Sequence, residues 1–246
     1  MSPLKLLFLF SLMIFSSKCS IDVIFLDLFR AFSNGLITNS FFIKFYEDLR
    51  RKQSRKFPEN FAKNKEAFKN HLAAIKHHNG FIEDQYNYKD MLYGVMSLSV
   101  NGGSLIAVYN VLNYLTKKDI DFPLIIKTFE NDGIIYDGKL GTSMKAVDDY
   151  FKKNGFNIWS SMNQKDYDTI AKATDATILS FYFGYGNIDI SKKIHFVAIT
   201  KENGKYYVHN NGDNSYKIAY NPITDILNKI NSGKVNHIYL TGIYKK

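Results

Sequence analysis

The chain has 246 residues, of which 46% are hydrophobic and 15% aromatic, and Lys and Arg together exceed Asp and Glu by nine. This composition argues against a disordered chain and is sufficient for one sizeable domain with a packed core. A single cysteine, Cys19, excludes an intrachain disulfide framework and a cysteine-based metal site.

The positive net charge could favour phosphate, nucleic acid or anionic lipid as a partner. Most lysines, however, are scattered singly or in pairs over amphipathic segments, as on an ordinary solvated face, so nucleic acid is not the expected partner. The six histidines show no ligand spacing, and we expect neither a metal nor another cofactor. The closest approach to a basic cluster is formed by Arg50, Arg51, Lys52, Arg55 and Lys56.

Residues 1–19 have the three-part pattern of a secretory signal. Lys5 precedes the apolar run 6–15, and small residues at Ser17 and Cys19 suit cleavage before Ser20. The pattern predicts a signal peptide or signal anchor and a secreted or membrane-associated protein. The apolar stretch 21–32 leaves an alternative open, in which the first segment is an uncleaved structural helix and the protein is cytoplasmic. No run free of charges reaches the roughly twenty residues of a membrane span.

Residues 20–80 are predicted to form a helical extension, either an αα-hairpin or a small helical cap. Apolar residues recur there at helical spacing in two segments. Pro58 separates these segments, and Asn79-Gly80 is a helix-ending signal. The basic face of this region leaves docking on a membrane surface open. The apolar positions are Phe41, Phe42, Phe45 and Leu49, then Phe61, Phe68, Leu72 and Ile75.

From residue 81 to 246 the pattern changes to mixed helix and strand, which predicts an α+β domain. Helices are expected at 105–115, 124–129, 143–151, 167–173 and 222–230. Strands are expected at 156–159, 176–183, 194–200, 205–209, 216–219 and 237–243. Glu202-Asn203-Gly204 is a tight-turn signal, so the strands on either side of it should form an antiparallel hairpin.

Four segments in this order carry a resemblance to a known family. They are Tyr93-Gly94 with the glycine-led apolar helix 101–110, then 140–146, 194–199 around His195, and 204–210. Together they resemble the papain-like family related to the peptidase domains of bacteriocin-processing transporters, over residues 88–244. The resemblance implies a papain-like cysteine peptidase fold, with helices packed on an antiparallel sheet.

The resemblance also implies residue roles. In that family a cysteine at the helix start attacks an acyl carbon, a histidine takes its proton, and an Asn or Asp orients the imidazole. The histidine position falls on His195 and the orienting position on Asn210, with Asn211 or Asp213 as substitutes. The oxyanion glutamine of the family is expected a few residues before the nucleophile, where this chain has Ser97, Leu98 or Ser99. Gln85 lies further upstream.

The nucleophile position falls on Gly103, which has no side chain with which to attack. Ser104 is the possible substitute, but one step along a helix rotates a side chain by about 100 degrees. Its alternative interpretation is a helix cap that accepts backbone N–H groups. His195 and Asn210 likewise have ordinary alternatives, as a ring that fills space at a strand end and as a turn residue.

Three functions follow from this pattern. The leading hypothesis is a catalytically inactive papain-like domain that binds a peptide or protein segment in the former substrate cleft. The second is a hydrolase or acyltransferase that uses Ser104, His195 and Asn210. The third is a membrane-surface or assembly protein that docks through residues 20–80.

Overall fold

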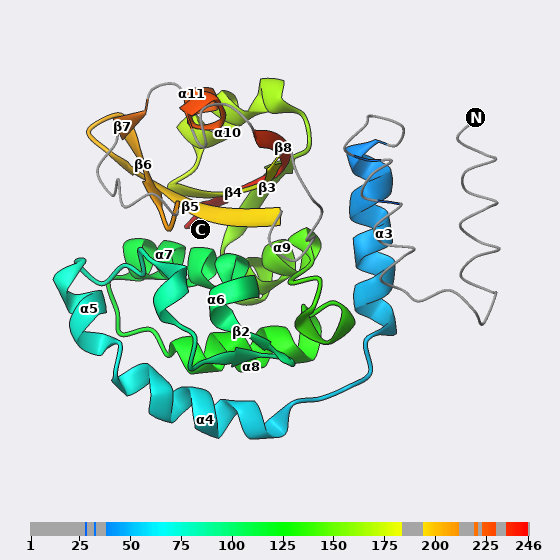
Figure 1. The fold of residues 1–246 in the computed structure, drawn as a ribbon. Helices are drawn as coiled ribbons and strands as arrows, with labels where there is room; N and C mark the ends of the chain where they lie inside the picture. The colour runs from blue at the N-terminus through cyan, green and yellow to red at the C-terminus, as the bar shows by residue number, and fades with distance from the viewer. Residues whose placement is uncertain are drawn as a thin grey trace.

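The computed structural model of the chain describes residues 28, 32, 38–183, 194–211, 219–220, 223–229 and 235–245. The predicted signal segment 1–19 and Asp213 lie outside these residues. Over the described part, the protein is an α+β structure with an antiparallel sheet and a helical layer, as the sequence predicts (Figure 1). No helix in this part combines the length and the apolar character needed to cross a bilayer.

The main sheet has six strands in the order β3-β8-β4-β5-β6-β7, and every neighbouring pair is antiparallel. The predicted hairpin is confirmed, since Glu202 pairs with Lys205 and the turn residues Asn203 and Gly204 have φ values of 50° and 75°. Two such left-handed residues match the twist of the flanking strands. The strands are β3 (Asn157–Ser161), β4 (Ala176–Phe183), β5 (Ile194–Glu202), β6 (Lys205–His209), β7 (Ala219–Tyr220) and β8 (Val235–Tyr244).

The sheet is covered on both faces by helices (Figure 1). Helices α7 (Gly103–Thr116) and α9 (Met144–Lys153) pack on one face, while α10 (Tyr167–Ala173) and α11 (Thr224–Lys229) pack on the other. Side chains of β4 therefore alternate between two apolar clusters: Ile178 and Tyr182 join the α7 side, and Leu179 and Phe181 the α10 side. Beyond α7 lie α8 (Phe122–Asp132) and, packed on α8, α4 (Pro58–Lys69).

The N-terminal helices do not form the αα-hairpin that was one of the two expected arrangements. Helix α3 (Asn39–Lys52) packs on α9, and α4 packs on α8, so the two helices lie on different sides of the molecule (Figure 1). Buried side chains from both helices join the same apolar cluster as α7, among them Phe42 and Phe68. Residues 38–80 thus wrap around the helical layer as a cap.

The second predicted helical stripe is wrong in part. The structure breaks it at Asn70 and His71 into α4 and the short α5 (Leu72–His77). Leu72 is half exposed, whereas Phe68 and Ile75 are buried as predicted. A small two-stranded sheet of β1 (Leu92–Tyr93) and β2 (Met96–Ser97) and the single helical turn α6 (Leu98–Asn101) then lead into α7.

Candidate functional site

The start of α7 is fixed by a pair of glycines. Helix α6 ends at Asn101, and Gly102 joins it to α7 with φ −81° and ψ −5°. A Cβ on Gly102 would lie 2.4 Å from the carbonyl oxygen of Leu98, so no other residue fits this connection. Gly103 is consequently the first residue of a 14-residue buried helix, where backbone N–H groups lack helical partners.

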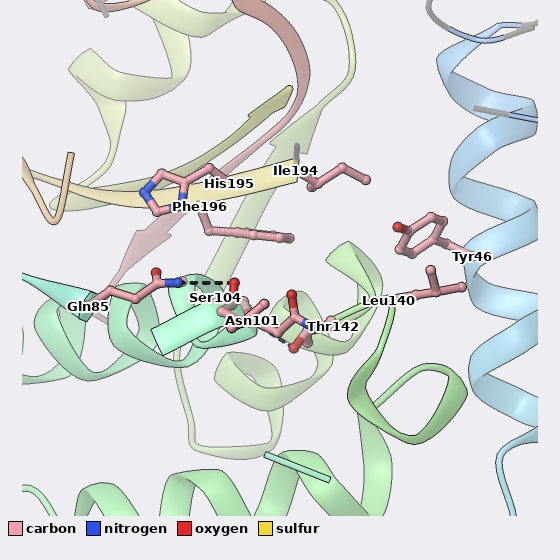
Figure 2. Close-up of a pocket in the computed structure, with 12 residues that line it drawn as sticks. Tyr46, Gln85, Asn101, Ser104, Leu140, Thr142, Ile194, His195 and Phe196 are labelled. Atoms are coloured by element: carbon pink, nitrogen blue, oxygen red, sulfur yellow. Dashed lines mark hydrogen bonds between the residues drawn. The ribbon is translucent and has the colours of Figure 1, made fainter. Parts of the chain in front are cut away.

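His195 lies directly against Gly103, as the sequence analysis proposed. A Cβ on Gly103 would lie 3.1 Å from Nδ1 of His195 and 3.4 Å from its Cε1. The imidazole stands at the beginning of β5 and contacts the ring of Phe181 edge to face, with 5.7 Å between the ring centroids. The ring therefore occupies the space beside the helix start that a side chain at position 103 would enter (Figure 2).

The tautomer of His195 follows from its hydrogen bond to Asn210. Nε2 donates to the backbone carbonyl oxygen of Asn210 over 2.8 Å, so Nε2 carries a proton. Burial lowers the pKa of His195, and the hydrogen bond to this carbonyl raises it by a smaller amount, so the ring is neutral at neutral pH. In that state Nδ1 carries a lone pair and faces Gly103.

Asn210 orients His195 through its backbone and not, as expected, through its side chain. Its φ of 62° places it in the left-handed region, which asparagine tolerates better than most residues. The side chain turns to Gln85: Oδ1 accepts from the Gln85 backbone N–H at 3.0 Å, and Nδ2 donates to Gln85 Oε1 at 3.3 Å. The side-chain role proposed for Asn210 is therefore wrong, although the residue lies where it was expected.

Gln85 belongs to the site, and the sequence analysis did not place it there. Its Oε1 would lie 3.2 Å from a Cβ on Gly103, while its Nε2 donates to the carbonyl oxygens of Ser99 and Val100 at 3.0 and 3.3 Å (Figure 2). The amide thus presents an acceptor to the helix start, with its donors used by the backbone. The β1–β2 hairpin between Gln85 and Gly103 folds back on itself, so the sequence separation gave no indication of this contact.

Ser104 points its proton away from the imidazole. Its Oγ donates to Thr142 Oγ1 at 2.7 Å, and Thr142 in turn donates to the hydroxyl of Tyr93 at 2.9 Å. All three side chains are buried. A serine nucleophile must give its proton to the base, so this arrangement does not prepare Ser104 for attack.

Residues 81–85 join the helical half of the site to the sheet half. On the helical side, Asn110 of α7 holds the backbone of Ile82 with two hydrogen bonds of 2.8 Å. On the sheet side, Glu83 accepts from the backbone N–H of Asn210 at 3.1 Å and bonds His209 Nδ1 at 2.7 Å. Glu83 and Gln85, the first residue of a single 3-10 turn, both bond Asn210 at the end of β6. The crossing segment 81–85 therefore sets the position of Gln85 relative to Gly103.

A small cleft, with a cavity volume of about 20 Å³ and partly open to solvent, lies beside Gly103 (Figure 2). It runs between the α7 start, the loop 140–142 and the beginning of β5, and Tyr46 of α3 contributes to its lining. Among the described residues that line it, none has a carboxylate, an ammonium or a guanidinium group. The lining residues are Tyr46, Gln85, Val100, Asn101, Gly103, Ser104, Leu140, Gly141, Thr142, Ile194, His195 and Phe196.

The basic cluster near the end of α3 lies outside this cleft and is partly neutralised. Arg50 forms ion pairs with Glu47 and Asp149, and Arg55 lies 3.4 Å from Asp137. Lys56 donates to the backbone carbonyl oxygen of Asn131. Within the described part of the chain, no group of three or more His, Cys, Asp or Glu side chains could hold a metal ion.

The site offers polar groups for hydrogen bonding, and the imidazole of His195 can accept a proton. Residue 103, however, is a glycine and has no side-chain atom that could act as a nucleophile. An imidazole with a lone pair directed at a helix start is the pairing that activates a thiol or hydroxyl in nucleophilic catalysis. Here the residue at the helix start, beside the imidazole, is Gly103. No protein-family model, no curated protein and no solved structure matches this chain.

Proposed function

We propose that the protein is a catalytically inactive domain with a papain-like fold that binds a peptide or protein segment in the cleft at Gly103. The observation that carries the proposal is the 3.1 Å between His195 Nδ1 and a Cβ on Gly103. A base placed this close to a helix start is arranged for a nucleophile, and glycine supplies none.

Four further observations support a papain-like origin of the site. The nucleophile position opens a buried helix that packs on the sheet, the base begins a strand of that sheet, and Gln85 lies beside both. The residue that orients the base follows the next strand, β6, across the hairpin turn. The departure is that the Asn210 carbonyl takes the role of the side chain.

A peptide segment suits the lining of the cleft. Amide, hydroxyl and imidazole groups lie there beside apolar side chains, and the part of the lining that the structure describes has no charged side chain. Such a surface can hydrogen-bond a peptide backbone without attracting a particular charge. The occupant is therefore expected to be an extended segment with small or uncharged side chains.

Binding is tested with random peptides displayed on phage, selected on the full chain. Gly103→Leu should abolish capture of the selected peptides, because its side chain must enter the space now taken by His195 and the cleft. Lys118→Ala is the matched control, since this exposed residue follows α7 at its other end, about 20 Å from Gly103. Selected peptides that bind both variants equally would contradict binding in this cleft.

The competing hydrolase hypothesis is tested separately. We expect the protein neither to hydrolyse p-nitrophenyl acetate faster than the buffer nor to be labelled by a fluorophosphonate, because Ser104 donates its proton to Thr142. Hydrolysis that is lost in Ser104→Ala, together with labelling of Ser104, would overturn the proposal in favour of a serine hydrolase.

A further inference from the structure

A buried hydrogen-bond network of Glu83, His209 and Thr200 adjoins Asn210, the residue to which His195 is bonded. His209 Nδ1 is 2.7 Å from Glu83 Oε1, and its Nε2 is 2.9 Å from the hydroxyl of Thr200. The ring of Phe81 stacks on His209 with 4.0 Å between the centroids. Glu83 and His209 are 6% and 5% exposed, so both are removed from water.

The network reaches His195 through one backbone residue. The second carboxylate oxygen of Glu83 accepts from the Asn210 N–H at 3.1 Å, and the Asn210 carbonyl accepts from His195 at 2.8 Å. The two bonds lie on either side of a residue in the left-handed conformation. The φ and ψ angles of Asn210 relate its N–H to its carbonyl group, so the bond from Glu83 helps to hold the carbonyl oxygen toward His195.

We propose that Glu83 is the positioning residue of this site, and that it fixes the tautomer and orientation of His195 through the backbone of Asn210. The inference deepens the proposed function and rests on it, because the orientation of His195 matters only if the cleft binds. In this protein the contact that orients His195 is made by the backbone carbonyl oxygen of Asn210, so its direction depends on how the backbone of Asn210 is held. Glu83 supplies the hydrogen bond that holds the backbone of Asn210 in place.

The chemistry of a carboxylate suits this task better than that of an amide. A carboxylate accepts hydrogen bonds at both oxygens, so it can hold the Asn210 N–H and the His209 Nδ1–H at once. An amide accepts at one end only. In Glu83→Gln the oxygen can still hold the Asn210 N–H, while the NH₂ group must donate to His209 Nδ1, which then has to lose its proton.

The test is ¹⁵N NMR of the histidine rings in the full, unliganded chain. In the wild type we expect His195 in the Nε2–H tautomer. Glu83→Asp, one methylene shorter, cannot reach both partners, and His195 should shift to a mixture of tautomers. Its pKa should fall further, because the hydrogen bond to the Asn210 carbonyl raises that pKa. Glu83→Gln should leave the His195 tautomer unchanged and switch His209 to Nε2–H.

Thr200→Val is the matched control, since it removes the other hydrogen bond of His209 and leaves the Glu83 to Asn210 bond in place. It should leave His195 unchanged. The inference would be overturned if His195 kept its wild-type tautomer in Glu83→Asp, or if its tautomer shifted equally in Thr200→Val. If Glu83→Asp does not fold, Glu83→Ala decides, because it removes the bond to the Asn210 N–H altogether: a His195 tautomer equal to that of the wild type would overturn the inference. Phage-peptide capture reports separately on the proposed function, because the tautomer is read without a ligand.

Discussion

At the scale of the residue, the site is defined by what position 103 lacks. The imidazole of His195 packs against the backbone of Gly103. A Cβ on Gly103 would lie only 3.1 Å from Nδ1 of the ring. A side chain there would have to move the ring by a few tenths of an ångström. Glycine thus keeps the base close to the helix start and removes the atom that the base would activate.

The neighbouring serine is expected to be structural. Ser104→Ala removes the donor to Thr142 inside a buried chain of three hydroxyls, so it should lower the free energy of unfolding by about 1–2 kcal/mol. Urea denaturation measures this change. Peptide capture in the phage assay should stay at the wild-type level. A variant with unchanged stability and no capture would contradict the structural role of Ser104.

Part of this site could be predicted from the sequence, because its parts lie on single elements. Gly103 and His195 were placed by the family resemblance, which rests on a glycine-led helix and on a strand before a tight turn. Glu83 and Gln85 could not be predicted in the same way, because they lie on an irregular segment with no periodicity. The only local signal was that a carboxylate and an amide, two residues apart, follow the helix-ending Asn79-Gly80.

At the scale of the element, a buried carboxylate fastens α9 to the sheet. Asp148 of α9 accepts hydrogen bonds from Ser160 of β3 and from Tyr239 and Thr241 of β8. Burial raises the pKa of Asp148, although these hydrogen bonds oppose the shift. The hydroxyls satisfy the carboxylate geometrically without restoring the solvation it had in water.

This raised pKa gives a prediction with a definite sign. A carboxyl group whose pKa is raised in the folded chain binds its proton more tightly there than in the unfolded chain. The protein therefore loses stability as pH rises from the unfolded pKa of this group, about 3.9, through its folded pKa. The asparagine in Asp148→Asn cannot ionise, so this variant does not show that loss of stability. The free energy of unfolding of the wild type minus that of Asp148→Asn should therefore decrease as pH rises over this interval. Urea denaturation at a series of pH values measures it, and an increasing difference would contradict the assignment.

Elements with strong local signals were predicted well, and the amphipathic cap was not. Strands β4 and β6 have the predicted bounds, because β-branched and aromatic runs there are ended by turn residues. Helix α9 starts at its predicted cap, where Ser143 Oγ accepts from the Ala146 N–H at 3.4 Å. The stripe through Phe61 and Leu72 is wrong in part, because α4 ends at Lys69 and the chain begins a new helix, α5, at Leu72, which is half exposed.

At the scale of the whole molecule, residues 38–80 and the rest of the chain share one core. The apolar cluster on the α7 side takes Phe42 from α3, Phe68 from α4 and Tyr182 from β4. Phe32 stacks on Phe42 at 4.3 Å and also contacts Tyr182 at 5.1 Å, between ring centroids. The N-terminal cap is therefore expected to fold together with the sheet.

This shared core predicts a single unfolding transition. Phe42→Ala should lower the free energy of unfolding by about 3–5 kcal/mol, because it empties a fully buried site. The transition should shift by the same amount in far-ultraviolet circular dichroism and in the fluorescence of Trp159, the single tryptophan, on β3. Separate shifts would mean that the cap unfolds independently of the sheet.

The whole account depends on the pairing of His195 with the start of α7. The most direct measurement is the ultraviolet titration of the thiol in Gly103→Cys, made in the Cys19→Ser background so that only one thiol is present. The helix start and the imidazole should stabilise the thiolate, and the pKa of the new thiol should lie well below the value of about 8.5 for free cysteine. Iodoacetamide should accordingly react with it faster than with free cysteine at neutral pH.

The control adds His195→Gln to the same protein, which removes the imidazole and leaves the helix start in place. The account predicts that the thiol pKa then rises most of the way back towards about 8.5. A thiol that titrates at or above that value while His195 is still present would contradict the account.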